Sequence, residues 1–259
     1  MLKIAISGCN GRMGRVITEI VAQKENMKVV AGFDLNTARL ADYPVYSDPL
    51  EFPGGCDVVV DFSNADVTAH LLEYCRRTRT PVVICTTGHS EAQLAQIREA
   101  AKEIPVFHSG NMSLGINLLL EVVRQCAAVL GADFDVEIIE KHHNQKLDAP
   151  SGTALMLADA AREALPYEAE YVYDRHTRRE KRPPHEIGIH SVRGGTIVGE
   201  HSVIFSGRDE IIEIKHNANS REVFAVGAVN AAAFLARQTA PGLYQMRDVI
   251  AAKQSAHEA

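Results

Sequence analysis

Two different patterns of hydrophobic residues divide the chain into a first and a second half. In the first half, short and nearly continuous apolar runs alternate with stretches in which apolar residues recur every three or four positions. The apolar runs lie at 2–7, 28–33, 58–62, 81–85 and 104–107, and helical stretches begin near residue 12 and lie at 66–78 and 91–102. Apolar strands that alternate with helices are typical of a parallel sheet with both faces covered. The pattern therefore predicts a doubly wound α/β domain.

The pattern of hydrophobic residues changes after Ser113. We expect a long helix at 115–130, a strand with one wet face at 135–140, a helix at 152–164, successive β-segments over 187–217, and helices at 221–238 and 243–253. Because strands and helices no longer alternate, the β-segments favour an open and largely antiparallel sheet. We therefore expect one domain from residues 1–113 and 222–259 and a second from residues 114–221.

Composition and charge narrow the class of protein. The 259 residues are 46% hydrophobic and 23% charged, which is typical of a globular protein. The formal net charge is -6, so no overall positive field attracts nucleic acid. The basic run at 175–182 is a local exception, but no aromatic residue is interleaved with it. A solvated loop is favoured there over a nucleic-acid site.

The cysteines and the apolar segments bear on the cellular compartment. Five cysteines form an odd and scattered set, which is typical neither of a disulfide framework nor of a zinc site. The first residues lack the layout of a signal peptide, and no apolar stretch approaches the roughly 20 residues of a membrane span. We expect reduced thiols in a cytoplasmic protein that does not enter a membrane.

A glycine-rich turn follows the first predicted strand and opens the first predicted helix. It has the spacing G-x-x-G-x-x-G and consists of Gly8, Cys9, Asn10, Gly11, Arg12, Met13 and Gly14. Glycine lets the backbone turn sharply and approach a pyrophosphate, whose charge then meets the free N–H groups of the helix. The spacing differs from the commoner G-x-G-x-x-G, and a turn needed only for helix packing is the alternative. The surrounding strand and helix favour a dinucleotide site.

Asp34 adds a prediction about the cofactor. It lies 20 residues beyond Gly14 at the end of the next strand, where an acid accepts hydrogen bonds from the adenosine ribose. A carboxylate repels a 2′-phosphate, and Leu35 and Asn36 supply no cation to counter it. Arg12 is the one nearby cation that we considered. The sequence therefore favours NADH and leaves NADPH open.

Two later turns are candidates for the same site. They are Thr86-Thr87-Gly88 and Gly110-Asn111-Met112-Ser113, and each follows a predicted strand. Ligands of open α/β sheets bind beyond the carboxyl ends of the strands. Simple turn chemistry is the alternative for each turn taken alone.

A histidine–lysine segment, E-K-H-H-N-Q-K-L-D-A-P-S-G-T-A at 140–154, carries the densest chemistry of the chain. His142 is able to donate or accept a proton near neutral pH, and Lys146 does so where burial or a second cation destabilises its ammonium form. Ser151 is a good N-cap, so the N–H groups of Gly152 and Thr153 would face an anion. The segment suits a substrate that carries carboxylates and takes up a proton, although a solvated polar loop stays open as an alternative.

A metal site is not favoured in this segment. Adjacent His142 and His143 would point in different directions on an extended chain, and no carboxylate completes a ligand set at helical spacing. Arg193, before Gly194-Gly195, either reaches a substrate carboxylate or marks a turn. His201 and His216 lie on β-segments, where hydrogen-bonded structural histidines are favoured over ligands.

The segment at 140–154 resembles the signature of the dihydrodipicolinate reductases, the 4-hydroxy-tetrahydrodipicolinate reductases of lysine and diaminopimelate synthesis. The similarity continues in family order through motifs at 8–15, 86–88, 111–113, 198–201, 207–208, 242–244 and 246–249. The resemblance implies a Rossmann-type domain, a second α+β domain built on an open mixed sheet, and usually a homotetramer. It also implies hydride transfer from NADH or NADPH to C4 of a small dicarboxylate, with the first domain binding the dinucleotide and the second the substrate.

The resemblance also implies site residues by position. His142 resembles the family's acid–base residue and Lys146 its proton donor. Substrate carboxylates would be held by His143, Ser151, Gly152 and Thr153. The dinucleotide would be contacted by Gly8, Cys9, Asn10, Gly11, Arg12, Met13, Asp34, Cys85, Thr86, Thr87, Gly110, Asn111, Met112 and Ser113. Cys85 and Met112 depart from the family, where many relatives have glycine and phenylalanine.

The function expected from the sequence is NAD(P)H-dependent reduction of 4-hydroxy-tetrahydrodipicolinate to tetrahydrodipicolinate. One alternative is another two-domain dehydrogenase that oxidises an amino or hydroxy acid. A second alternative is a nicotinamide-sensing protein without catalysis. The presence of both His142 and Lys146 speaks against the sensor, because a degenerate catalytic site would lose these residues most easily.

Overall fold

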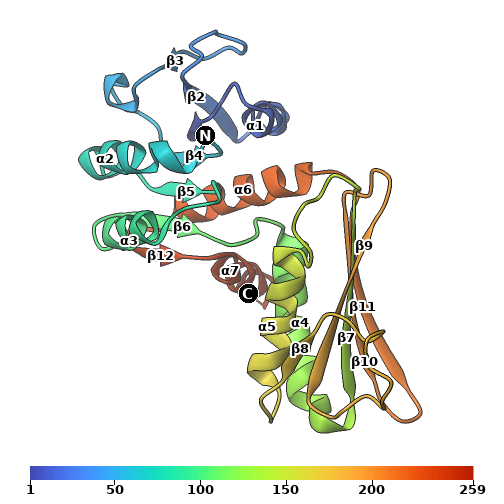
Figure 1. Ribbon diagram of the computed structural model, residues 1–259. Coiled ribbons are helices and arrows are strands. Elements are labelled where there is room, and N and C mark those ends of the chain that lie inside the picture. Colours follow the sequence, from blue (N-terminus) through green and yellow to red (C-terminus); the bar gives the residue numbers. More distant parts are fainter. Residues whose placement is uncertain (259) are drawn as a thin grey trace. The chain divides into compact units, whose positions relative to one another are not determined.

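Two compact units make up the part of the chain that the computed structural model describes, residues 1–258. The first unit contains Met1–Leu114 and the chain from Glu222 onward, and the second contains Gly115–Arg221. Ala259, which ends the first expected domain, lies outside the described residues. Figure 1 labels the helices and strands of both units.

The first unit is built on a seven-stranded parallel sheet in the order β12-β6-β5-β4-β1-β2-β3 (Figure 1). Its strands are β1 (Leu2–Ser7), β2 (Met27–Phe33), β3 (Val45–Tyr46), β4 (Val58–Asp61), β5 (Val82–Ile84), β6 (Pro105–His108) and β12 (Gly242–Tyr244). The apolar runs predicted five of these strands: β1, β2, β4, β5 and β6. β3 was missed because it has only two residues, and β12 because its sequence, Gly242-Leu243-Tyr244, does not form an apolar run.

Alternate residues of the central strands enter two different cores. Ile4 and Ile6 of β1 pack into one hydrophobic cluster, while Ala5 between them packs into another. Both faces of the strand are therefore buried, which explains its nearly continuous apolar sequence. The predicted doubly wound α/β architecture is confirmed.

Helices cover each face of this sheet. They are α1 (Arg12–Ala22), α2 (Thr68–Thr78), α3 (Glu91–Ala100), α6 (Glu222–Leu235) and α7 (Met246–Glu258), with 3₁₀ turns η1 (Pro49–Glu51) and η2 (Ala65–Val67). Residues of α1, α6 and α7 belong to the cluster that contains Ile4, and residues of α2 and α3 to the cluster that contains Ala5. The alanine-rich sequence of α6 allows close packing, and an added Cβ at Gly227 would lie 1.7 Å from the carbonyl oxygen of Met112.

The second unit is built on a five-stranded mixed sheet in the order β11-β10-β7-β9-β8. Its elements are α4 (Leu114–Leu130), η3 (Gly131–Asp133), β7 (Asp135–His142), α5 (Gly152–Ala164), β8 (Glu170–Val172), β9 (Glu186–Arg193), β10 (Gly199–Ser206) and β11 (Ile211–Ala218). β10 is antiparallel to both of its neighbours, but β9 runs parallel to β7 and to β8. The mixed sheet implied by the resemblance is confirmed, and the largely antiparallel sheet read from the pattern was wrong. The three residues of β8 were too short to reveal the β7-α5-β8 alternation.

Two helices lie on one side of this second sheet (Figure 1). Their buried residues, including Leu119, Val123 and Leu157, share one cluster with Ile138 of β7. The expectation that no apolar stretch reaches membrane-span length was wrong, because Leu114–Asp133 forms 20 residues with a mean hydropathy of 1.5. This is weak evidence for a membrane span, since the core helix of a soluble domain meets the same criteria of length and composition, and α4 contributes four buried residues to the cluster.

The alternation of β7 decides where its polar side chains lie. Residues 136, 138, 140 and 142 are buried, and the intervening residues are less buried. Ile138 faces the helices in the core, so Glu140 and His142 lie on the same face at the carboxyl end of the strand. Glu137 lies on the opposite face.

Candidate active site

The glycine turn of the first unit joins β1 directly to α1. Gly8 has φ of 76°, and an added Cβ there would lie 2.7 Å from the carbonyl oxygen of Phe62, so glycine is required both for the backbone conformation and for the close approach. Gly11 is the N-cap of α1 and makes no side-chain capping bond. The first N–H groups of α1 are therefore not satisfied by a cap, which is typical of an anion-binding turn.

Asp34 is held against this turn by backbone donors. Its Oδ2 accepts from the N–H of Asn10 at 2.9 Å, and its Oδ1 accepts from the N–H of Asn36 at 3.0 Å. The amide of Asn10 in turn donates to the carbonyl oxygens of Asn36 and Ala38 at 2.6 and 2.8 Å. Asn10 thus links the glycine turn to the segment that follows β2. The sequence predicted Asn10 and Asp34 as site residues but not this clasp between them.

A cavity of about 300 Å³ lies beside the turn and Asp34. It is lined by Ser7, Gly8, Gly11, Phe33, Asp34, Leu35, Ser47, Pro49, Phe62, Ser63, Asn64, Val67, His70 and Leu71. Among these described lining residues there is no lysine or arginine, and Asp34 is the only acid. The size and the single carboxylate suit a neutral ribose with its base.

The two later turns lie at the carboxyl ends of neighbouring strands β5 and β6. Thr86 is buried, and its hydroxyl donates to Oδ2 of Asp61 at 2.7 Å. Asn111 accepts the N–H of Ser113 through its Oδ1 at 2.8 Å, just before α4. Asp61 ends β4 and is fully buried, and the sequence reading missed it because its apolar neighbours marked it only as a strand residue.

Cys9 and Cys85 are buried thiols at these turns. Burial, the larger cause, and the nearby charge of Asp34 raise the pKa of Cys9 to about 11. Burial and then Asp61 raise the pKa of Cys85 well above its usual value. Both side chains are therefore protonated and act as packing groups. All five cysteines are free thiols.

In the second unit, His142 is the last residue of β7 and is 9% exposed. Its Nδ1 lies 2.6 Å from Oε2 of Glu140. Burial, the largest cause, lowers the pKa of His142, and the nearby charges of Lys146 and Arg193 act in the same direction against the opposing effect of Glu140. The imidazole is therefore neutral at neutral pH and able to take up a proton at Nε2.

Lys146 and His143 lie in the loop after His142. The ammonium of Lys146 is paired with Oδ1 of Asp148 at 2.8 Å, and its side chain is 21% exposed. Nη2 of Arg221 lies 3.2 Å from Nε2 of His143, so the guanidinium donates to the imidazole. Arg221 was missed from the sequence because it stands 78 residues away and belongs to no recognisable motif.

Ser151 begins α5 as its N-cap, as predicted. Its hydroxyl accepts the N–H of Ala154 at 3.1 Å and lies 3.0 Å from Nε2 of His201. Burial and the neighbouring His142 lower the pKa of His201 to about 4, so its ring is neutral. His201 supports the N-terminus of the helix that begins at Gly152, which matches the expected structural role on a β-segment.

Arg193 is bound within the second unit. Its guanidinium forms two bonds to the carboxylate of Glu140, at 2.6 and 2.8 Å, and a third to the carbonyl oxygen of Asp148 at 2.7 Å. The turn reading of Gly194 is also correct, since its N–H donates to the carbonyl oxygen of His142. Through residues 1–258, no three histidine, cysteine, aspartate or glutamate side chains are grouped to hold a metal ion.

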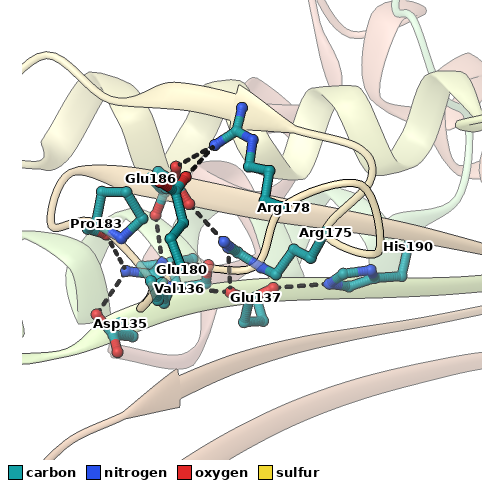
Figure 2. Close-up of polar contacts among 10 residues, drawn as sticks. Asp135, Val136, Glu137, Arg175, Arg178, Glu180, Pro183, Glu186 and His190 are labelled. Carbon is teal, nitrogen blue, oxygen red and sulfur yellow. Dashed lines mark hydrogen bonds and ion pairs between the residues drawn. The ribbon is translucent and has the colours of Figure 1, made fainter.

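The basic run forms ion pairs within the second unit rather than a free positive surface (Figure 2). Arg175 binds Glu137 and Glu186, and Arg178 also binds Glu186. Arg182 binds Glu137 at 3.0 Å and Asp135 at 2.6 Å. Three arginines of the basic run are therefore paired with acids of the second unit.

Comparison with known proteins gives one consistent family. Residues 2–112 match the model of the N-terminal part of dihydrodipicolinate reductase, and residues 115–250 match the model of the C-terminal part. A 4-hydroxy-tetrahydrodipicolinate reductase of Caldanaerobacter subterraneus subsp. tengcongensis is 54% identical over 250 residues, which cover 96% of this chain and 98% of the relative. The enzyme of the same name from Clostridium tetani is 48% identical over 95% of this chain and 96% of the relative.

A solved structure has the same fold along nearly the whole chain. The dihydrodipicolinate reductase of Paenisporosarcina sp. TG-14, with dipicolinate bound, superposes with a TM-score of 0.77 at 27% identity. The match covers 95% of this chain and 97% of that protein.

Proposed function

The chain belongs to the dihydrodipicolinate reductase family, and we propose that it reduces 4-hydroxy-tetrahydrodipicolinate to tetrahydrodipicolinate with NADH or NADPH. This reaction is a step of lysine and diaminopimelate synthesis. The 54% identity to a relative named for this activity, over 96% of the chain, carries the proposal. The two other hypotheses, a dehydrogenase of amino or hydroxy acids and a non-catalytic sensor, are not favoured by these relatives.

A nicotinamide dinucleotide fits the residues of the first unit. The uncapped start of α1 suits its pyrophosphate, and the cavity beside Asp34 suits its adenosine. The residues that would hold it are Gly8, Cys9, Asn10, Gly11, Arg12, Met13, Asp34, Cys85, Thr86, Thr87, Gly110, Asn111, Met112 and Ser113. When bound, the dinucleotide supplies the hydride.

The second unit provides the groups for a dicarboxylate that gains a proton. The N–H groups of Gly152 and Thr153 at the start of α5, with Ser151 as cap, would hold one carboxylate, and His143 beside Arg221 would hold the other. Lys146 would donate the proton as an ammonium group, and His142 would exchange a proton at Nε2.

We further infer a preference for NADH over NADPH. Both oxygens of Asp34 are fixed by backbone donors, so the carboxylate stays beside the ribose position. None of the described residues that line the adenosine cavity is a lysine or an arginine to neutralise a 2′-phosphate. Arg39, which follows in the chain, is not among the residues that line this cavity.

Calorimetric titration of both dinucleotides tests this preference. We expect the dissociation constant of NADH to be the smaller one, and Leu35→Arg to narrow the difference by supplying a cation. Tighter binding of NADPH to the wild-type protein would contradict the inference, without bearing on the reaction itself.

The reaction is tested by the loss of NADH absorbance with freshly generated substrate. We expect turnover by the wild-type protein and a fall in kcat of about 10²- to 10⁴-fold in Lys146→Ala, while the dissociation constant of the cofactor barely changes. Lys141→Ala is the matched control, because this lysine lies in the same motif but on the face of β7 opposite His142, where it is paired with Glu200 at 3.3 Å. Absence of turnover with either cofactor would refute the proposed activity.

The assembly and location of the protein are part of the proposal. We propose a homotetramer formed through the sheet face turned away from α4 and α5, where Val192 and Ile211 are 44% and 68% exposed. Light scattering of the purified protein would measure the mass. The free cysteines support a cytoplasmic location.

A further inference from the structure

Glu140 is a fully buried carboxylate that makes four hydrogen bonds with three residues. Its Oε1 accepts from Nη2 of Arg193 at 2.6 Å and from the N–H of Ser151 at 3.1 Å. Its Oε2 accepts from Nη1 of Arg193 at 2.8 Å and lies 2.6 Å from Nδ1 of His142. One side chain therefore contacts both the proposed acid–base residue and the residue that caps α5.

The ionisation of Glu140 determines which atom donates in its contact with His142. Burial alone would raise the pKa of Glu140, but hydrogen bonds from Arg193, His142 and Ser191 lower it to about 2. The ionised carboxylate has no proton to give, so Nδ1 of His142 must be the donor. A neutral His142 then carries its proton on Nδ1 and has a lone pair on Nε2.

We infer that Glu140 is the positioning residue of this site: it holds His142 in the Nδ1–H tautomer, with Nε2 free for proton exchange, and ties it to the start of α5 through Ser151. The inference rests on the proposed function only for the statement that His142 exchanges a proton with substrate. The tautomer and the connection to Ser151 follow from the contacts of Glu140.

Arg193 explains why Glu140 acts through His142 and not as a base itself. Two hydrogen bonds to the guanidinium hold the carboxylate in its ionised form and occupy both oxygens. The remaining acceptor positions go to His142 and Ser151. The pair stands 53 residues apart in the chain and meets because β7 and β9 are neighbours, with His142 opposite Arg193 in the register.

Every element packed around His142 contributes to its state. Glu140 faces it from β7, Arg193 from β9, and His201 from β10 with ring centroids 5.2 Å apart, while the charge of Lys146 reaches it from the loop. Of these groups only Glu140 favours the protonated imidazole. Its removal should therefore lower the pKa of His142 further.

Gly199 lies beside the other ring nitrogen of His142, Nε2. An added Cβ at this position would lie 3.1 Å from Nε2 of His142, closer than side chains normally pack. The ring is not free to turn away, because Nδ1 is bound to Glu140. Gly199→Ala should therefore obstruct Nε2 while leaving the Nδ1–H tautomer intact.

Nitrogen NMR of the ligand-free protein tests the tautomer directly. With ¹⁵N-labelled histidine assigned through a His142→Gln variant, we expect wild-type His142 to show a protonated Nδ1 and an unprotonated Nε2 at neutral pH. In Glu140→Gln, the amide NH₂ is able to donate to Nδ1, so the Nε2–H tautomer should gain population. Glu200→Gln is the matched control. Glu200 lies on β10 next to His201, the residue opposite Glu140 in the register, and is paired with Lys141 and Lys215.

Steady-state kinetics tests the consequence. We expect Glu140→Gln to lower kcat by about 10- to 100-fold, the scale known for groups that orient metal-binding histidines. The limb of the pH profile that belongs to His142 should move to lower pH, whereas a loss of folded protein would reduce the amplitude without moving it. Glu200→Gln should keep the wild-type profile, and Gly199→Ala should lower kcat without moving the limb.

The outcomes separate this inference from the proposed function. An Nε2–H tautomer in the wild-type protein would overturn the role of Glu140, even if Glu140→Gln failed to fold. An unmoved pH limb in a folded Glu140→Gln variant would overturn it as well. If the protein shows the Nδ1–H tautomer but reduces no substrate, the positioning stands and the proposed reaction fails.

Discussion

Glu137 and Glu140 stand three residues apart on β7 and bind the same kinds of partner. Each carboxylate contacts at least one arginine and one histidine. An odd separation on a strand places the two side chains on opposite faces of the sheet. The same chemistry is thus used twice on one strand, in two different surroundings.

The two clusters differ in burial and in what they connect. Glu137 is bound by Arg175, Arg182 and His190 (Figure 2). The two arginines belong to the loop between β8 and β9 and hold it against the sheet, whereas His190 lies on β9. Burial alone would raise the pKa of Glu137, but these three partners lower it. Glu140 has a single arginine and is fully buried. Two arginines on the sheet face opposite the helices secure a loop, whereas one arginine in the core leaves a carboxylate free to orient a histidine.

Arg193→Met should have the largest effect on the free energy of unfolding. This change leaves the buried carboxylate of Glu140 without its only cation, and we expect a loss of about 3–5 kcal/mol in the free energy of unfolding. Urea denaturation at neutral pH measures the loss. A loss below 1 kcal/mol would mean that Glu140 does not depend on Arg193, and the contrast with Glu137 would fail.

His201 gives a pH-dependent test of the same buried face. Its pKa of about 4 in the folded protein lies below the ordinary value of 6.5, so between these pH values the unfolded chain binds a proton that the folded protein does not bind. The contribution of His201 to the free energy of unfolding is therefore fully present above pH 6.5, and about 3 kcal/mol is lost as the pH drops toward 4. Denaturation curves recorded at several pH values in this range should show that the free energy of unfolding falls less steeply with decreasing pH in His201→Asn than in the wild-type protein. An equal dependence on pH in the two proteins would show that the ring of His201 is not held neutral.

Arg175→Met should have the smallest effect. Arg182 and His190 still bind Glu137, and Arg178 still binds Glu186, so we expect a loss of about 1–2 kcal/mol. Limited proteolysis should cut the loop at 173–185 faster, with kcat unchanged. Arg39→Met is the exposed control, since its pair with Asp42 is largely solvated. A fall in kcat comparable to that of Glu140→Gln would remove the distinction between the two clusters.

The fold was predicted best where burial is uniform. Strands such as β1 and β4 are covered on both faces, so their apolar runs were visible without any knowledge of neighbours. The second sheet was harder, because strand direction depends on connections and not on side-chain alternation. β8 carries that information in three residues, and the parallel pairing of β7 with β9 became visible only in the structure.

Within the candidate site, the motif residues were recognisable because they lie close together in the chain. Their supports were not. Arg193, His201 and Arg221 stand 53, 50 and 78 residues from the side chains that they contact. The sequence singled out Arg193 and His201 but not their partners, because no local pattern indicates a contact over such separations.

Local patterns were therefore enough to predict the doubly wound first domain, the glycine turn, the start of α5 and the family. They did not decide the partner of any buried charge. Glu140 appeared as one acid in a polar segment, and the pairing of β7 with β9 and β10 made it the centre of a cluster. The physical reason is that periodicity and capping act over a few residues, whereas a buried carboxylate is stabilised by whichever donors the sheet brings beside it.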